Sequence, residues 1–157
     1  MYWVMWIGII ILCLVGQTVY ADVLTICEIK PDLLLIIIIF FAFKHSSFET
    51  GIIGFIAGIL QDSLSGINQG INTFTKLIIG LSVSSIKKIH KENLISISLS
   101  IFIFTLIQNL LIFAIQSIFI ISPGISSLNR VFFIAIYNTI LGILIYPIIH
   151  KIKSGEG

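Results

Sequence analysis

The chain has 157 residues, of which 57% are hydrophobic and only 10% are charged. Its mean hydropathy is +1.14. A soluble domain of this size cannot bury so much apolar side chain, so the composition excludes a soluble protein and indicates an integral membrane protein. The formal net charge of +2 is too small to suggest binding to nucleic acid.

Apolar runs separated by short polar loops predict an all-α membrane protein with six transmembrane helices in a single integral membrane domain, residues 1–157. We expect the helices at about 3–21, 31–44, 48–64, 71–88, 94–121 and 128–150. The first run is long enough to span the hydrocarbon, and a cleaved signal peptide is the alternative, although the run lacks a basic start. Pro147 should kink the last helix or mark the interface.

The second helix has only about a dozen apolar residues, which is short for a membrane span. It should therefore be tilted, shielded by its neighbours, or seated where the bilayer thins. Pro31 and Asp32 stand at its start, where the missing N–H of proline costs nothing. Ser46 or Ser47 is a candidate N-cap for the third helix.

The distribution of basic residues predicts the topology. With six helices, both termini, the loop between the second and third helices and the loop between the fourth and fifth helices lie on one side of the membrane. That side would carry six basic residues: Lys44, Lys87, Lys88, Lys91, Lys151 and Lys153. The other side would carry three: Lys30, Lys76 and Arg130. The positive-inside rule then places both termini in the cytoplasm and the loop at 65–70 outside.

Glycines follow one face of the third helix and continue into the fourth. Gly51, Gly54, Gly58 and Asp62 recur every three or four residues, and Asn72, Lys76, Gly80 and Ser84 recur every four. Such stripes let helices approach closely. We expect the site for helix packing and for a partner helix to comprise Gly51, Gly54, Gly58, Asp62, Gly66, Gly70 and Gly80.

Asp62 and Lys76 flank the turn at about equal distances, so we expect them to pair across the hairpin. An unpaired intramembrane charge costs about 2.5 to 3.5 kcal/mol on insertion scales. The alternative is that either side chain extends to the headgroups. Amides on the last two helices should form interhelical hydrogen bonds, with a ligand pocket as the alternative; they are Gln108, Asn109, Gln116 and Asn138.

Catalytic chemistry has no support in the sequence. The histidines, His45, His90 and His150, lie beside lysines at helix ends and lack metal-ligand spacing. No nucleophile stands with a base, and no phosphate-binding loop or carboxylate pair occurs. We therefore expect no enzyme, no metal and no cofactor.

Three segments in order resemble the bacterial rod shape-determining protein family MreD: PDLLL from Pro31, GFIAGILQDSLSG ending at Gly66, and GINTFTKLIIG from Gly70 to Gly80. The resemblance carries over Pro31, Asp32, Gly54, Gly58, Asp62, Gly66 and Gly70. Lys76 is not part of the family pattern, so its pairing with Asp62 rests on spacing alone.

This resemblance implies a multi-pass subunit of the cytoplasmic membrane in the cell-elongation complex, with a body similar to the S-component of energy-coupling factor transporters. The implied partners are an MreC-like bitopic protein and, indirectly, MreB, RodA and a class B penicillin-binding protein. The alternative function is an S-component-like subunit that binds a vitamin for a transporter. The glycine-lined hairpin would hold the partner's transmembrane helix.

Overall fold

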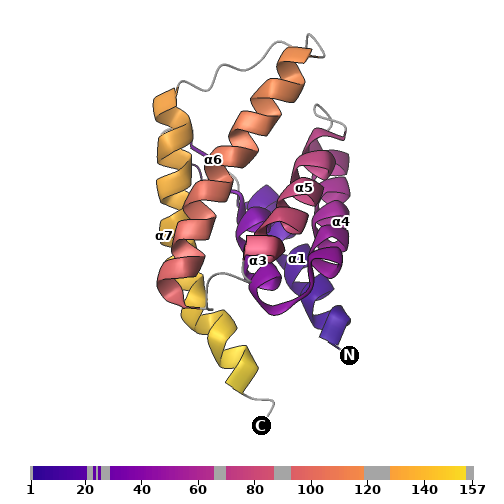
Figure 1. The fold of residues 1–157 in the computed structure, drawn as a ribbon, viewed down its shortest axis with the longest axis vertical. Coiled ribbons are helices and arrows are strands. Elements are labelled where there is room, and N and C mark those ends of the chain that lie inside the picture. The colour runs from indigo at the N-terminus through magenta and orange to yellow at the C-terminus, as the bar shows by residue number, and fades with distance from the viewer. Residues whose placement is uncertain are drawn as a thin grey trace.

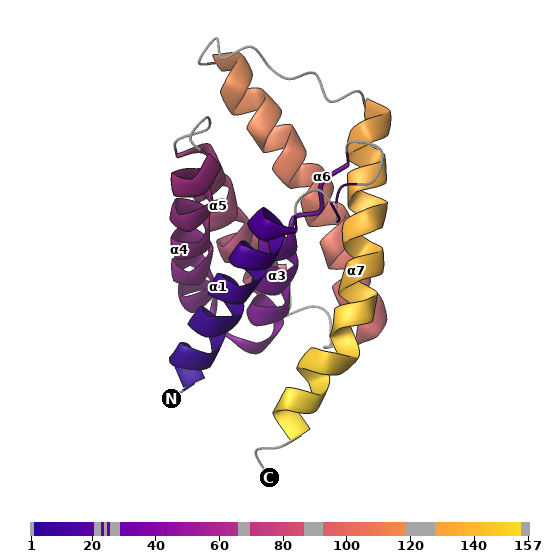
Figure 2. The same ribbon diagram turned by 180° about the vertical axis from the view of Figure 1, so that it is seen from behind.

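The computed structural model describes residues 2–20, 23, 25, 29–65, 70–86, 93–118 and 128–154. Within these ranges the chain forms six helices, which Figures 1 and 2 show from opposite sides. They are α1 (Tyr2–Val19), α3 (Leu33–Lys44), α4 (Ser47–Ser65), α5 (Ile71–Ile86), α6 (Leu94–Ile118) and α7 (Leu128–Ser154).

The helices agree with the expected ones to within a few residues, and the differences have local causes. α3 begins at Leu33 because Asp32 is its N-cap. α7 continues through Pro147 to Ser154, a few residues past the expected end at His150, because proline removes one backbone donor without ending a helix that is otherwise favoured. Figures 1 and 2 show that α7 changes direction in its last third. The expected helical residues 21, 87–88 and 119–121 lie outside the described ranges.

The short helix α3 is the centre of the bundle. Its ten residues from Leu34 to Phe43 are all buried, as expected for a helix that is apolar on every side. It packs against α1, α4, α5, α6 and α7, and Figures 1 and 2 show it enclosed between them. Shielding by neighbours is therefore how this short apolar helix is accommodated.

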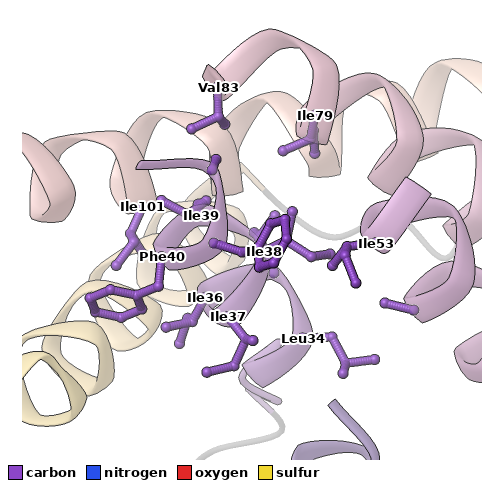
Figure 3. Close-up of a cluster of buried hydrophobic side chains, with 14 of the residues drawn as sticks. Leu34, Ile36, Ile37, Ile38, Ile39, Phe40, Ile53, Ile79, Val83 and Ile101 are labelled. Atoms are coloured by element: carbon purple, nitrogen blue, oxygen red, sulfur yellow. The ribbon is translucent and has the colours of Figure 1, made fainter. Parts of the chain in front are cut away.

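Side chains radiate from α3 into the surrounding helices (Figure 3). Ile39 lies toward Ile79 and Val83 of α5, and Ile53 of α4 and Ile101 of α6 belong to the same cluster. These side chains have at most 1% of their surface exposed. Tight apolar packing on all sides therefore fixes the position of α3, and with it the position of the residue at its N-terminus.

In the part of the chain that the structure describes, two helices, α6 and α7, are long and apolar enough to cross a membrane, with spans at Leu94–Ile118 and Asn129–Ile149. Two shorter apolar helices lie at Val4–Val19 and Leu33–Lys44. α1 contacts the bundle through Trp6, Ile10 and Leu14, which recur every four residues and are buried. The ring of Trp6 packs edge-on against Phe41 of α3, with the centroids 5.1 Å apart.

The junction between α3 and α4 is closed by a capping box. Ser46 Oγ accepts a hydrogen bond from the backbone N–H of Glu49 (3.3 Å), and Glu49 Oε2 accepts one from the backbone N–H of Ser46 (2.9 Å). This reciprocal arrangement satisfies two backbone donors that the helix leaves free. Of the two candidate N-cap residues, Ser46 is the one that caps α4.

Candidate functional site

A buried polar centre surrounds the N-terminus of α3. The Asp32 carboxylate accepts a hydrogen bond from the backbone N–H of Leu35 through Oδ1 (3.0 Å), the usual geometry of an N-cap. Its second oxygen, Oδ2, accepts from Lys76 Nζ of α5 (2.5 Å) and from Gln108 Nε2 of α6 (2.7 Å). One carboxylate therefore joins three helices.

The polar centre extends to α7 through Asn138. The Asn138 side-chain oxygen accepts a hydrogen bond from the backbone N–H of Asp32 (3.0 Å), and its Nδ2 donates to Thr105 Oγ1 of α6 (3.2 Å). Lys76 Nζ also lies 3.4 Å from Gln108 Oε1. Lys76 and Asn138 have no exposed surface. The network links α3, α5, α6 and α7 in the interior.

The depth of this centre follows from the length of α3. Twelve helical residues extend about 18 Å, well short of the roughly 30 Å hydrocarbon core. Because α3 is enclosed by longer helices, its N-terminus lies inside the helical body. A buried charge at such a depth requires a partner of opposite sign and further hydrogen bonds, and Lys76 and Gln108 supply them.

The expected pair of Asp62 and Lys76 is therefore wrong, because Lys76 pairs with Asp32. The register of the hairpin explains the difference. Gly58 of α4 lies against Thr73, so Asp62 is level with the first residues of α5, more than a turn away from Lys76. The N-terminus of α5 offers free N–H groups there, and a carboxylate binds them well.

Asp62 caps α5 by accepting several hydrogen bonds. Its Oδ2 accepts from the backbone N–H groups of Gly70 (3.0 Å) and Thr73 (2.9 Å) and from Thr73 Oγ1 (2.6 Å). Its Oδ1 accepts from the backbone N–H (3.2 Å) and from Nδ2 (2.9 Å) of Asn72. Gly70 adopts a φ of +90°, which favours glycine. Gly66, which was expected in the same site as Gly70, lies outside the described residues.

The glycine stripe of α4 is filled by α5. A Cβ added to Gly51 would lie 2.7 Å from Leu81 Cδ2, and one added to Gly80 would lie 2.6 Å from the carbonyl oxygen of Thr50. Gly54 and Gly58 face the backbone of Lys76 and Thr73 still more closely. These glycines serve close packing within the chain. This agrees with the expected helix-packing role, and α5 itself occupies the surface on which a partner's helix was expected.

Hydroxyl side chains reinforce the other end of the same interface. The hydroxyls of Thr50 and Ser84 lie 2.8 Å apart, and Ser84 Oγ also donates to the carbonyl oxygen of Ala42 (3.3 Å). Ser84 therefore ties α5 to both α4 and α3. Polar side chains of this kind hold membrane helices together at modest energy, about 0.6 kcal/mol each.

Sequence reasoning found part of the polar centre. The prediction of interhelical hydrogen bonds is confirmed for Gln108 and Asn138, whereas Asn109 donates within its own helix to the carbonyl oxygen of Thr105 (2.8 Å). Asp32 was expected only at a helix start. The sequence did contain a signal for this role. An acid that caps a wholly apolar helix is buried together with that helix, and a buried carboxylate needs a nearby cation. Among the described residues, no group of three or more His, Cys, Asp or Glu side chains could hold a metal ion.

Residues 1–153 match the family described as rod shape-determining protein MreD. The chain belongs to the MreD family. Members are non-enzymatic, shape-determining membrane proteins, so this chain is an integral membrane protein with a role in rod shape determination. No curated protein and no solved structure matches the chain.

Proposed function

We propose that this protein is a subunit of the bacterial cell-elongation complex in the cytoplasmic membrane. It would bind an MreC-like bitopic protein and so support lateral peptidoglycan synthesis, with MreB, RodA and a class B penicillin-binding protein as indirect partners. The observation that carries this proposal is the family match over residues 1–153. The basic residues at its loops and tail further favour cytoplasmic termini.

The geometry supports a scaffold. The carboxylates of Asp32 and Asp62 accept hydrogen bonds from other helices of the same chain. The interior glycines are likewise filled by neighbouring helices. A partner helix must therefore dock on the outside of the bundle.

We place this docking surface on α1. A Cβ added to Gly8 or Gly16 would meet nothing within 4 Å, in contrast to the filled glycines of α4 and α5. Between them Leu12 has 73% of its surface exposed, and the three residues recur every four positions. Glycine costs about 1 kcal/mol in a helix relative to alanine. Close approach of a partner helix offers a reason for two of them here.

The test has two levels. The full chain, expressed in a rod-shaped bacterium depleted of its own MreD, should restore rod shape and co-purify with the MreC-like protein. A wild-type chain that inserts stably but does neither would overturn the proposed function.

The docking surface is tested separately with Gly8→Leu and Gly16→Leu, each of which should abolish co-purification while the protein remains inserted. Ile140→Trp is the matched control, because it adds bulk at an exposed position of α7. Undiminished recovery with both glycine variants would show that the partner docks elsewhere and would leave the family role intact.

A further inference from the structure

Four of the helices around α3 carry an amide side chain near the level at which α3 begins. Gln108 and Asn138 mark this level directly, because both form hydrogen bonds with Asp32, the N-cap of α3. The four amides are Gln17 of α1, Gln61 of α4, Gln108 of α6 and Asn138 of α7. The fifth neighbouring helix, α5, contributes Lys76.

The level of Gln61 follows from contacts near the other end of α3. Ser84 Oγ contacts both the Thr50 hydroxyl of α4 and the Ala42 carbonyl oxygen of α3, so Thr50 and Ala42 share a level. Gln61 lies about 16 Å from Thr50 along α4. Asp32 lies about 15 Å from Ala42 along α3, in the same direction. Gln61 is therefore level with the N-cap of α3.

The level of Gln17 follows from the contact between α1 and α3. The ring of Trp6 packs against Phe41, and Gln17 lies about 16 Å from Trp6 along α1. Asp32 lies about 14 Å from Phe41 along α3, again in the same direction. Gln17 and Gln61 therefore lie at nearly the same depth, on two helices that flank α3.

Both glutamines continue a helix face that packs on α3. Gln17 follows Leu14 of α1 by three positions and Gln61 follows Ala57 of α4 by four, and both preceding residues are buried in the core cluster. Helix α3 has ended at the level of the glutamines. The chain there includes Pro31, which is buried and has no N–H to donate.

The two glutamines present buried acceptors at this level. Gln17 Oε1 and Gln61 Oε1 are both buried, and neither accepts a hydrogen bond from the described part of the chain. The Asp32 side chain keeps 12% of its surface accessible, whereas that of Lys76 has none. Buried polar groups that lack a protein partner are commonly satisfied by ordered water, which makes about three hydrogen bonds.

We propose that the level of these amides is a hydrated site, in which ordered water donates hydrogen bonds to Gln17 and Gln61 and reaches the accessible edge of the Asp32 carboxylate. The site suits a small neutral donor such as water, because the charges of Asp32 and Lys76 offset each other. A few ordered waters do not replace bulk hydration, so Asp32 still requires its lysine.

Water enters from the end of the bundle that carries the α4–α5 turn. Lys76 is only about 8 Å from the first residue of α5 at that end. The opposite end of α3 lies about 18 Å from Asp32 and is closed by its buried apolar residues.

Cysteine reactivity of the full chain tests this proposal. Cys13→Ala and Cys27→Ala remove the native thiols, and one cysteine is introduced as Gln17→Cys or Gln61→Cys, so that each variant keeps the other glutamine. The protein is reconstituted in phosphatidylcholine vesicles, and its reaction with 2-aminoethyl methanethiosulfonate is followed by mass spectrometry. This small, water-soluble reagent attacks the ionised thiol, which forms in contact with water.

Two matched variants serve as controls. Ala57→Cys is the dry control, because Ala57 has no exposed surface and lies one turn from Gln61 on the same face. Leu110→Cys is the lipid control, because Leu110 is 70% exposed and lies two residues from Gln108, at nearly the same level.

The expected result is a reaction at positions 17 and 61 at least tenfold faster than at 57 and 110. A reaction at 17 or 61 no faster than at 57 would overturn the proposal by showing that the amide level is dry. A reaction at 110 as fast as at 61 would also overturn it, because the whole level would then lie outside the hydrocarbon.

Discussion

Asp32 and Asp62 are both buried acids that cap helices, yet the protein stabilises their charges in different ways. Asp62 lies at a helix–helix turn and accepts hydrogen bonds from neutral groups, the N–H and hydroxyl groups at the start of α5. Asp32 lies inside the bundle and pairs with a lysine, supported by Gln108.

The difference reflects depth. Close to a turn, the free N–H groups of a helix end can satisfy a carboxylate, and water or headgroups lie within reach. In the interior only a full counter-charge offsets the cost of removing the carboxylate from water. Breaking the contacts of Asp32 should therefore cost more than breaking those of Asp62.

The largest effect is expected for Lys76→Met, which leaves the Asp32 carboxylate buried without its cation. Loss of one partner of a buried ion pair typically destabilises a protein by about 3 to 5 kcal/mol. The measurement is reversible unfolding of the purified protein in mixed detergent micelles. The double variant Asp32→Asn with Lys76→Met should recover much of the loss, because no unpaired charge remains. A double variant as unstable as the single one would contradict the importance of charge balance.

The next effect is expected for Gly58→Leu, because even the first added carbon would collide with the backbone of Thr73. Backbone yields less readily than a side chain, so we expect a loss of about 2 to 3 kcal/mol in the same unfolding assay. Gly8→Leu is the matched control, since that position is open and exposed. Equal free energies of unfolding for the two variants would show that the α4–α5 contact is looser than the structure indicates.

A smaller effect is expected for Asp62→Ala, which removes the cap of α5. Loss of an N-cap side chain costs about 1 to 2 kcal/mol, less than the loss expected at Lys76. Hydrogen exchange at the first turn of α5 should rise, with little change at α6. A loss as large as that of Lys76→Met would mean that depth does not distinguish the two acids.

The smallest effect is expected for Thr50→Val, which keeps the shape of the side chain and removes its hydrogen bond to Ser84. Interhelical hydrogen bonds of this kind contribute about 0.6 kcal/mol in membrane proteins. Unfolding of Thr50→Val beside Ser84→Ala and the double variant gives the coupling directly. A coupling energy between Thr50 and Ser84 larger than the destabilisation caused by Asp62→Ala would reverse the proposed order.

Much of the fold was predictable because it depends on local pattern. Predominantly apolar runs place the six helices of the described residues, and the spacing of Gly51, Gly54 and Gly58 indicates a close helix contact. The amides at Gln108 and Asn138 were expected to bond between helices, and they do. In each case the residue types within a short stretch of sequence are enough to make the prediction.

The partner of each charge was not predictable in the same way. Equal spacing from the turn pointed to Asp62 for Lys76, but spacing says nothing about the direction in which a long side chain extends. Likewise, the glycine pattern identifies a surface for close packing without showing which helix fills it. In the structure that helix is α5 itself.

By itself the sequence determined the membrane class, the helices and the resemblance to a shape-determining family, because composition and periodicity act over short stretches of chain. Only the tertiary structure decided that the twelve-residue α3 lies at the centre and that its capping acid pairs with Lys76 from 44 residues away. The physical reason is that burial is a property of all the surrounding helices together. A charge acquires its partner from whichever helix that packing brings beside it.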